Sequence, residues 1–157
     1  MASSDTTTTT TTTTTDGSNP LTEISNATEL DYYLRGALLS SSSSDNNNNG
    51  SIVIVTFSTH WCGPCQRSKP KLIEMAQKYN SNNKDSTTTS IHFAYVPETD
   101  MNDDFIEEYN INAFPTYICF KQGDDDDGTA SVEEVDRVEG ANLEQVETMI
   151  QNHHFKK

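Results

Sequence analysis

Long apolar runs are missing from this sequence of 157 residues. None approaches the ~20 residues that a helix needs to cross a bilayer, so a membrane-spanning protein is excluded. Residues 1–20 also lack the apolar segment of a secretory signal peptide. We therefore expect a soluble, cytoplasmic protein with no membrane partner.

Basic residues are also scarce: there are 10 Lys and Arg residues against 24 Asp and Glu residues, which gives a formal net charge of −14. Nucleic acid binding needs a basic surface that neutralises phosphates, so nucleic acid is excluded as a partner. We attribute the acid excess to solubility. A local basic cluster, Arg67, Lys69 and Lys71, is either a solvated helix face or positive charge that helps to hold a cysteine thiolate, and we favour the solvated face.

Cysteine is rare, with three in the chain. In a reducing cytosol this number is not a disulfide framework. Cys62 and Cys65 are separated by two residues, and Cys119 lies in an apolar segment where a buried small side chain is expected. The sequence has no second Cys-x-x-Cys and no paired histidines at zinc-ligand spacing, so we expect no metal. A redox pair and a purely structural pair are the remaining interpretations of Cys62 and Cys65.

Hydrophobic residues make up 32% of the chain, below the average of about 45–50% for globular domains. The deficit lies in low-complexity tracts of Thr, Ser, Asn and Asp, which cannot bury enough apolar surface to offset the entropy of ordering. We interpret residues 1–19 as a disordered Thr-rich tail. Residues 20–157 form one domain, with low-complexity insertions near 40–50, 80–90 and 124–130.

The segments between these tracts alternate between strand and helix patterns. Strands are predicted over 21–24, 51–57, 91–96, 116–121 and 131–138. Helices are predicted from an Asn26 cap to Leu38, over 66–79, over 103–109, and after an Asn142 cap. Residues 51–57 are apolar without alternation, which indicates a central strand buried on both faces.

The resulting order is β-α-β-α-β-α-β-β-α. Early alternation of strands and helices predicts parallel strands, and the final hairpin adds antiparallel ones. The fold class is therefore α/β: a mixed sheet of five strands flanked by helices on both faces.

The central strand runs into a helix through Cys62 and Cys65. A helix N-terminus has unsatisfied N–H groups and a positive dipole end, and both favour a thiolate, the nucleophilic form of cysteine. The two intervening residues hold the sulfurs close enough to bond. We expect one reactive thiol and one partner that closes a disulfide behind it.

These residues resemble the thioredoxin family. Trp61-Cys62-Gly63-Pro64-Cys65 is identical to its active-site motif, and Phe114-Pro115-Thr116 is similar to its cis-proline loop. Pro70 is similar to its helix-kinking proline, and Gly140 to the glycine before its last helix. The resemblance covers residues 21–152 and implies the thioredoxin fold.

The resemblance implies a protein-disulfide reductase in which Cys62 is the nucleophile and Cys65 the resolving thiol of a redox-active Cys62–Cys65 disulfide. It gives supporting roles to Trp61, Gly63, Pro64 and Pro115. It implies disulfide-containing proteins as substrates and no bound cofactor, with electrons from an NADPH-dependent thioredoxin reductase. We expect a monomer.

Two departures from the family pattern stand out. The family has a buried aspartate six residues before the nucleophile, where this chain has Thr56, and a hydroxyl cannot act as a base near neutral pH. Arg67 and Ser68 stand where the family usually has apolar residues. Thr56, Arg67 and Ser68 together motivate the alternative of a thioredoxin-fold interaction module with weak redox turnover.

Overall fold

The computed structural model describes residues 19–39, 50–82, 90–99, 104–124 and 127–154. Residues 1–18 of the predicted tail, and most of the predicted insertions near 40–50 and 80–90, lie outside the described residues. Regular structure extends into two of the predicted insertions. A helix continues to Asn82 in the insertion near 80–90, and in the insertion near 124–130 one strand ends at Asp124 and the next begins at Ala130.

The described elements follow the predicted order. They are β1 (Thr22–Glu23), α1 (Ala27–Leu39), β2 (Ile52–Phe57), α2 (Gly63–Asn82), β3 (Ile91–Val96), α3 (Asp104–Glu108), β4 (Thr116–Asp124), β5 (Ala130–Glu139) and α4 (Leu143–His154). The strands form one sheet in the order β1-β3-β2-β4-β5. Strands β1, β3 and β2 are parallel, and β4 is antiparallel to β2 and β5. The predicted mixed sheet is confirmed.

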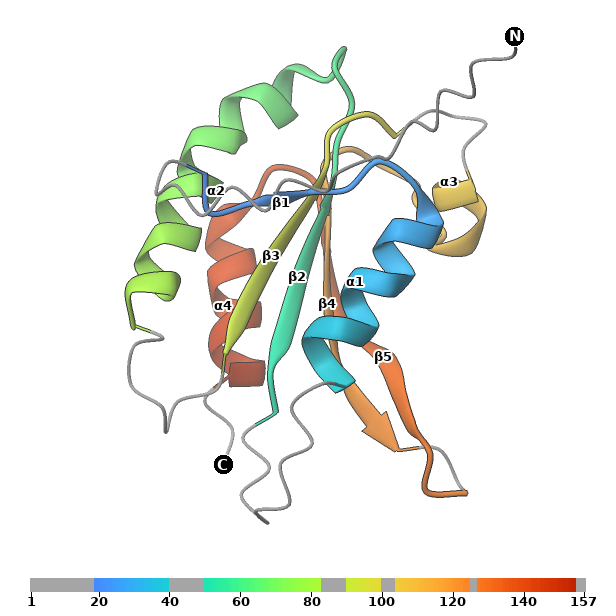
Figure 1. The fold of residues 1–157 in the computed structure, drawn as a ribbon. Coiled ribbons are helices and arrows are strands. Elements are labelled where there is room, and N and C mark those ends of the chain that lie inside the picture. The colour runs from blue at the N-terminus through green and yellow to red at the C-terminus, as the bar shows by residue number, and fades with distance from the viewer. Residues whose placement is uncertain (1–18, 40–49, 83–89, 100–103, 125–126, 155–157) are drawn as a thin grey trace, which may run out of the picture.

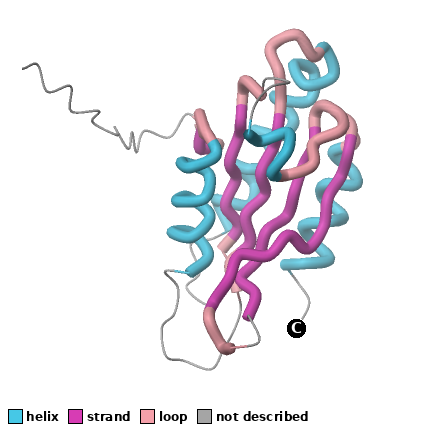
Figure 2. The backbone as a smooth tube through the Cα atoms, turned by 90° about the vertical axis from the view of Figure 1, so that its right-hand side faces the viewer, coloured by secondary structure: helices cyan, strands magenta, loops and turns pink. Residues whose placement is uncertain are grey.

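Helices cover both faces of the sheet, α2 and α4 on one face and α1 and α3 on the other (Figure 1; Figure 2). Central strand β2 has all six residues buried, as predicted. Its side chains alternate between the two cores. Ile52 and Ile54 pack beneath α2 and α4, whereas Val53, Val55 and Phe57 pack beneath α1 and α3.

Strand β5 contains a bulge that accounts for its imperfect apolar alternation. The register with β4 shifts between Cys119 and Phe120, and Val135 is left without a partner residue. An extra residue reverses which face the following side chains occupy. Val132 therefore packs on the α1 side of the sheet, while Val138 packs on the α2 and α4 side.

The helix starts follow the predicted caps, with one difference that affects the site. The Asn26 Oδ1 atom accepts the Glu29 N–H at 2.9 Å, and the Asn142 Oδ1 atom accepts the Gln145 N–H at 3.2 Å. Helix α2, however, begins at Gly63, three residues before the predicted start. The second cysteine of the pair therefore lies inside the first helical turn.

We predict opposite effects for two glycine-to-alanine substitutions. Gly140 has a φ of +88°, which is unfavourable for residues with a Cβ, so Gly140→Ala should destabilise the fold by about 1–2 kcal/mol. Gly36 lies exposed in α1 with nothing near its Cβ position, so Gly36→Ala should stabilise it by about 0.5–1 kcal/mol. Urea unfolding of both variants measures this, and effects of the same sign would contradict the assignment of Gly140.

Cys119 should be unreactive in the native protein. It is fully buried in β4, and burial raises the pKa of its thiol to about 12, so it stays protonated at ordinary pH. Iodoacetamide at pH 8 should leave Cys119 unmodified by peptide mass spectrometry until urea is added. Native-state alkylation at the rate of a free cysteine peptide would show that β4 opens.

Candidate active site

Cys62 caps the N-terminus of α2. Its carbonyl oxygen accepts the Gln66 N–H at 3.2 Å, and its Sγ atom accepts the Cys65 N–H at 3.2 Å. A side chain that accepts an N–H from the first turn is the usual arrangement of a helix N-cap. Cys62 and Cys65 form a disulfide, with 5.3 Å between their Cα atoms. Their sulfurs thus stand where the helix donors and dipole favour negative charge.

The second part of the site comes from the loop before β4. The peptide bond between Phe114 and Pro115 is cis, as the motif predicts. The Phe114 carbonyl oxygen lies 3.5 Å from Cys62 Sγ. The Trp61 side chain, whose residue is 61% exposed, packs edge-on against the Phe114 ring at 5.7 Å between centroids. Residues from both halves of the chain therefore meet at the disulfide.

A surface hollow of about 440 Å³ opens beside Cys62. It is lined by Trp61, Cys62, Gly63, Pro64, Ile111, Asn112, Ala113 and Phe114. Cys65 is not among the lining residues. Of the two sulfur-bearing residues, it is thus Cys62 that borders the space a second molecule can enter.

Sequence reasoning missed residues 111–113 and the side chain that holds their loop. Arg137 on β5 donates hydrogen bonds to the carbonyl oxygens of Tyr109 and Asn110, at 3.0 and 3.1 Å. Asn110 has a φ of 49°, which turns the chain back toward the site. Arg137 is 27 residues away in sequence, and no motif connects it with this loop.

Buried hydroxyl groups lie on the sheet face beneath α2. Thr56 is paired across the sheet with Tyr95 and Tyr117, so the three side chains share that face. The Tyr117 hydroxyl donates to Ser68 Oγ at 3.2 Å, and Ser68 Oγ donates to the Cys65 carbonyl oxygen at 3.1 Å. Burial raises the pKa of Tyr117, so its hydroxyl remains a donor. The network therefore holds the first turn of α2 onto the sheet.

Thr56 and Ser68 are both buried, at 2% and 7% exposure. The Ser68 side chain points to the sheet, so its hydroxyl adds a polar group to the interior beneath α2. Thr56 Oγ1 has no hydrogen-bond partner among the described residues. The position beneath the first turn of α2 is thus occupied by a neutral, unpartnered hydroxyl.

Gly63 makes room for Arg67. A Cβ atom on Gly63 would stand 3.2 Å from Arg67 Nη1, because the guanidinium folds back over the first turn of α2. Arg67 therefore lies beside the cysteine turn, and the basic cluster predicted from sequence does not point in one direction. Lys69 instead lies over the Tyr95 ring, with its Nζ atom 4.5 Å from the ring centroid.

Two kinds of feature are not found in the part of the chain that the structure describes. No group of three or more His, Cys, Asp or Glu side chains there is placed to hold a metal ion. None of the described helices has the length and apolar character needed to cross a membrane.

Comparisons with known proteins agree with the geometry. The thioredoxin family model matches residues 41–151. A thioredoxin of Coprinus comatus is 34% identical over 99 residues, covering 63% of this chain and 77% of that protein. The solved structure of Fasciola hepatica thioredoxin superimposes with a TM-score of 0.59 at 25% identity, covering 85% of this chain and 99% of that one.

Other curated relatives are longer than the matched region. Thioredoxin-2 of Pyricularia oryzae is 33% identical over 102 residues, and the match spans 65% of this chain and 48% of that protein. A thioredoxin of Geodia cydonium is 37% identical over 71 residues, 45% of this chain and 58% of that protein. The chain thus spans about half of the length of these relatives. The family match over most of the chain, together with the mixed five-stranded sheet and the Cys62–Cys65 pair at the start of α2, shows that the chain belongs to the thioredoxin family.

Proposed function

We propose that this chain is a thiol–disulfide oxidoreductase that reduces protein disulfides through a Cys62/Cys65 dithiol–disulfide cycle. The observation that carries the proposal is the asymmetry of the pair. Cys62 borders the open hollow and accepts an N–H from the first turn of α2, whereas Cys65 lies behind it. This asymmetry suits Cys62 as the nucleophile and Cys65 as the resolving thiol.

In the reduced protein the Cys62 thiolate attacks one sulfur of a substrate disulfide. The substrate S–S bond breaks, its departing sulfur takes up a proton, and a mixed disulfide with Cys62 forms. Cys65 then loses its proton and attacks Cys62 Sγ, which releases the second substrate thiol. One electron pair and its protons have passed to the substrate, and the Cys62–Cys65 disulfide is left.

The supporting residues shape the surface around this reaction. Trp61 and Phe114 offer an exposed apolar contact beside Cys62. The Phe114–Pro115 backbone lies close enough to Cys62 to align an extended substrate segment. Gly63 admits the Arg67 guanidinium, and Pro64 restricts the turn and removes one N–H donor.

The cycle needs an external source of electrons. We propose that an NADPH-dependent thioredoxin reductase supplies them, that disulfide-containing proteins are the substrates, and that the chain acts as a monomer without a bound cofactor. We propose the cytoplasm as its compartment, because a dithiol reductant works where thiols are kept reduced.

Single-cysteine variants test the cycle. With dithiothreitol and a small disulfide-bonded protein, Cys62→Ser should reduce no faster than the uncatalysed reaction, because the attacking thiolate is gone. Cys65→Ser, reduced beforehand and mixed with the substrate after the dithiothreitol is removed, should accumulate the mixed disulfide, visible by non-reducing electrophoresis and mass spectrometry. Cys119→Ser is the control and should keep full turnover.

The same variants separate the enzyme from an interaction module. Partner capture that persists in Cys62→Ser, with little turnover in the wild type, would replace the enzyme assignment by the module. The observation that favours the interaction module is the neutral hydroxyl of Thr56, which leaves the site without a buried base at this position.

Thr56→Asp should speed resolution of the mixed disulfide near neutral pH. A carboxylate at this buried position can take the proton of Cys65, and we expect about a tenfold gain, less than the ~100-fold of an evolved general base. Burial raises the pKa of such a carboxyl group, so the gain should vanish once pH falls below that pKa. Single-turnover kinetics measure it.

Thr56→Val is the matched control, since it keeps the shape of the side chain and adds no base. Thr56→Asp should also lower the thermal midpoint, because it buries a charge. Equal resolution rates in Thr56→Asp and the wild type would mean that proton transfer does not limit this step.

A further inference from the structure

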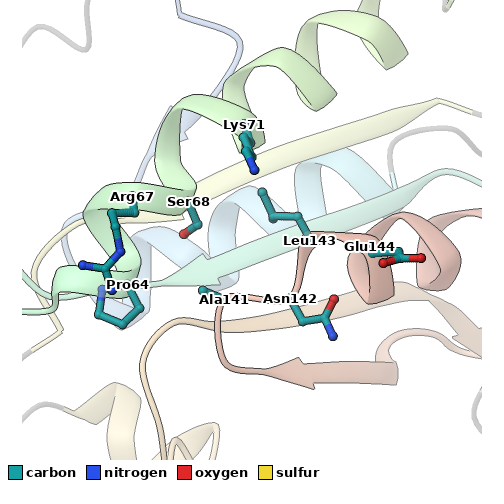
Figure 3. A pocket seen from close by; sticks show the side chains of 8 residues that line it. All are labelled: Pro64, Arg67, Ser68, Lys71, Ala141, Asn142, Leu143 and Glu144. Atoms are coloured by element: carbon teal, nitrogen blue, oxygen red, sulfur yellow. The ribbon is translucent and has the colours of Figure 1, made fainter.

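A second pocket, of about 520 Å³, lies between the first half of α2 and the start of α4 (Figure 3). It is lined by Pro64, Arg67, Ser68, Lys71, Ala141, Asn142, Leu143 and Glu144. Pro64 also lines the hollow beside Cys62. The two depressions therefore adjoin across Pro64, and a peptide that reaches Cys62 can extend into the second pocket.

The pocket carries more positive than negative charge, since Arg67 and Lys71 line it together with the single carboxylate of Glu144. Arg67 and Lys71 lie one helical turn apart on the same face of α2. Among the described residues, neither has a carboxylate within ion-pair distance, whereas Lys69 and Lys78 on the same helix do, at 4.0 Å from Glu23 and 2.6 Å from Glu147. Two cations that form no ion pair with the described residues thus share one depression in a protein of net charge −14.

The backbone of the opposite wall also contributes partial positive charge. It is the N-terminus of the 12-residue helix α4, whose dipole favours anions. Asn142 caps the Gln145 N–H, while the earlier residues Leu143 and Glu144 line the pocket. Glu144 is the one carboxylate among the eight lining residues, and it stands at the end away from Pro64 (Figure 3). Arg67 therefore lies at the end of the pocket nearest the cysteines, and the only lining carboxylate lies at the other end.

We propose that this pocket is a specificity subsite that binds an acidic side chain of the disulfide-bearing substrate segment. This rests on the proposed reductase function and names a substrate class for it: protein disulfides flanked by Asp or Glu. The substrate segment passes over Pro64 on one side of its cysteine, and the acidic residue lies on that side. Arg67 and Lys71 supply the complementary charge, which in an otherwise acidic protein raises the encounter rate of such segments over neutral or basic ones.

The test uses a set of peptides, each with one cysteine held in a mixed disulfide. The peptides differ only at the positions that flank this cysteine, where Glu, Gln or Lys is placed at one position at a time. Trp61 is the single tryptophan of the chain and lies in the turn next to Cys62, so its fluorescence follows closure of the disulfide. Stopped-flow measurement gives the second-order rate constant for each peptide. On one side of the cysteine, the Glu peptide should react about fivefold faster than the Gln peptide, as expected for a partly exposed charge contact.

The Glu-to-Gln rate ratio is the readout in the variants, because a general change of thiol reactivity cancels in it. Arg67→Gln with Lys71→Gln should bring the ratio to about one, and high salt should do the same. Lys69→Gln is the control, since it removes a cation of the same helix that does not line the pocket. Glu144→Gln should raise the ratio.

Equal rates for the Glu and Gln peptides at every position would overturn the subsite. A preference that survives in the Arg67→Gln, Lys71→Gln protein would overturn it as well. Either result leaves the reductase function intact, whereas failure to reduce any of the peptides would remove the function itself.

Discussion

The cysteine turn at the N-terminus of α2 is held in place by the strand before it and the helix after it, which pack into the same core. The site depends on this packing. Strand β2, which precedes the cysteine turn, is buried on both faces and cannot shift without exposing apolar side chains. Helix α2, which follows the turn, buries Leu72, Ala76 and Tyr79 against the same sheet. The turn between them is therefore held at both ends.

The same register brings the distant half of the site to the disulfide. Phe57, the last residue of β2, is paired with Thr116, the first residue of antiparallel β4. The chain leaving β2 and the chain entering β4 thus lie at the same end of the sheet, and Phe114 comes beside Cys62. Gly140 completes the arrangement, because its N–H donates to the Pro115 carbonyl oxygen at 2.8 Å.

Sequence alone predicts those parts of this structure that depend on local patterns. The order of elements, the central buried strand and the two helix caps follow from apolar spacing and capping residues. The site's core also follows, because Trp61–Cys65 and Phe114–Thr116 are contiguous motifs. The bulge at Val135 was not predictable, since an extra strand residue leaves only a flawed alternation in the sequence. The predicted start of α2 is three residues too late, because Gly63 and Pro64 are poor formers of a helix interior but are tolerated in a first turn, which Cys62 caps.

What escapes the sequence entirely is the electrostatic division of α2. Arg67, Lys69 and Lys71 form one basic cluster in the chain, for which the sequence favours a solvated face. Arg67 and Lys71 are exposed, as this predicts, whereas Lys69 is half-buried. In the fold, the neighbouring positions diverge, as helical geometry requires. Lys69 turns to Tyr95 and Glu23, while Arg67 and Lys71 line the pocket toward α4 and form no ion pair with a described carboxylate.

The cysteine turn therefore has a neutral environment on its buried side and a positively charged one on its exposed side. Beneath it, Thr56, Ser68 and Tyr117 provide hydroxyl groups that carry no charge. At the surface, Arg67 reaches over Gly63 and contributes positive charge close to Cys62. Positive charge at the entrance favours a thiolate and an acidic substrate alike, whereas a neutral interior offers Cys65 no base. In the proposed cycle, this arrangement assists the attack by Cys62 more than the resolution by Cys65, which places discrimination among substrates at the first encounter.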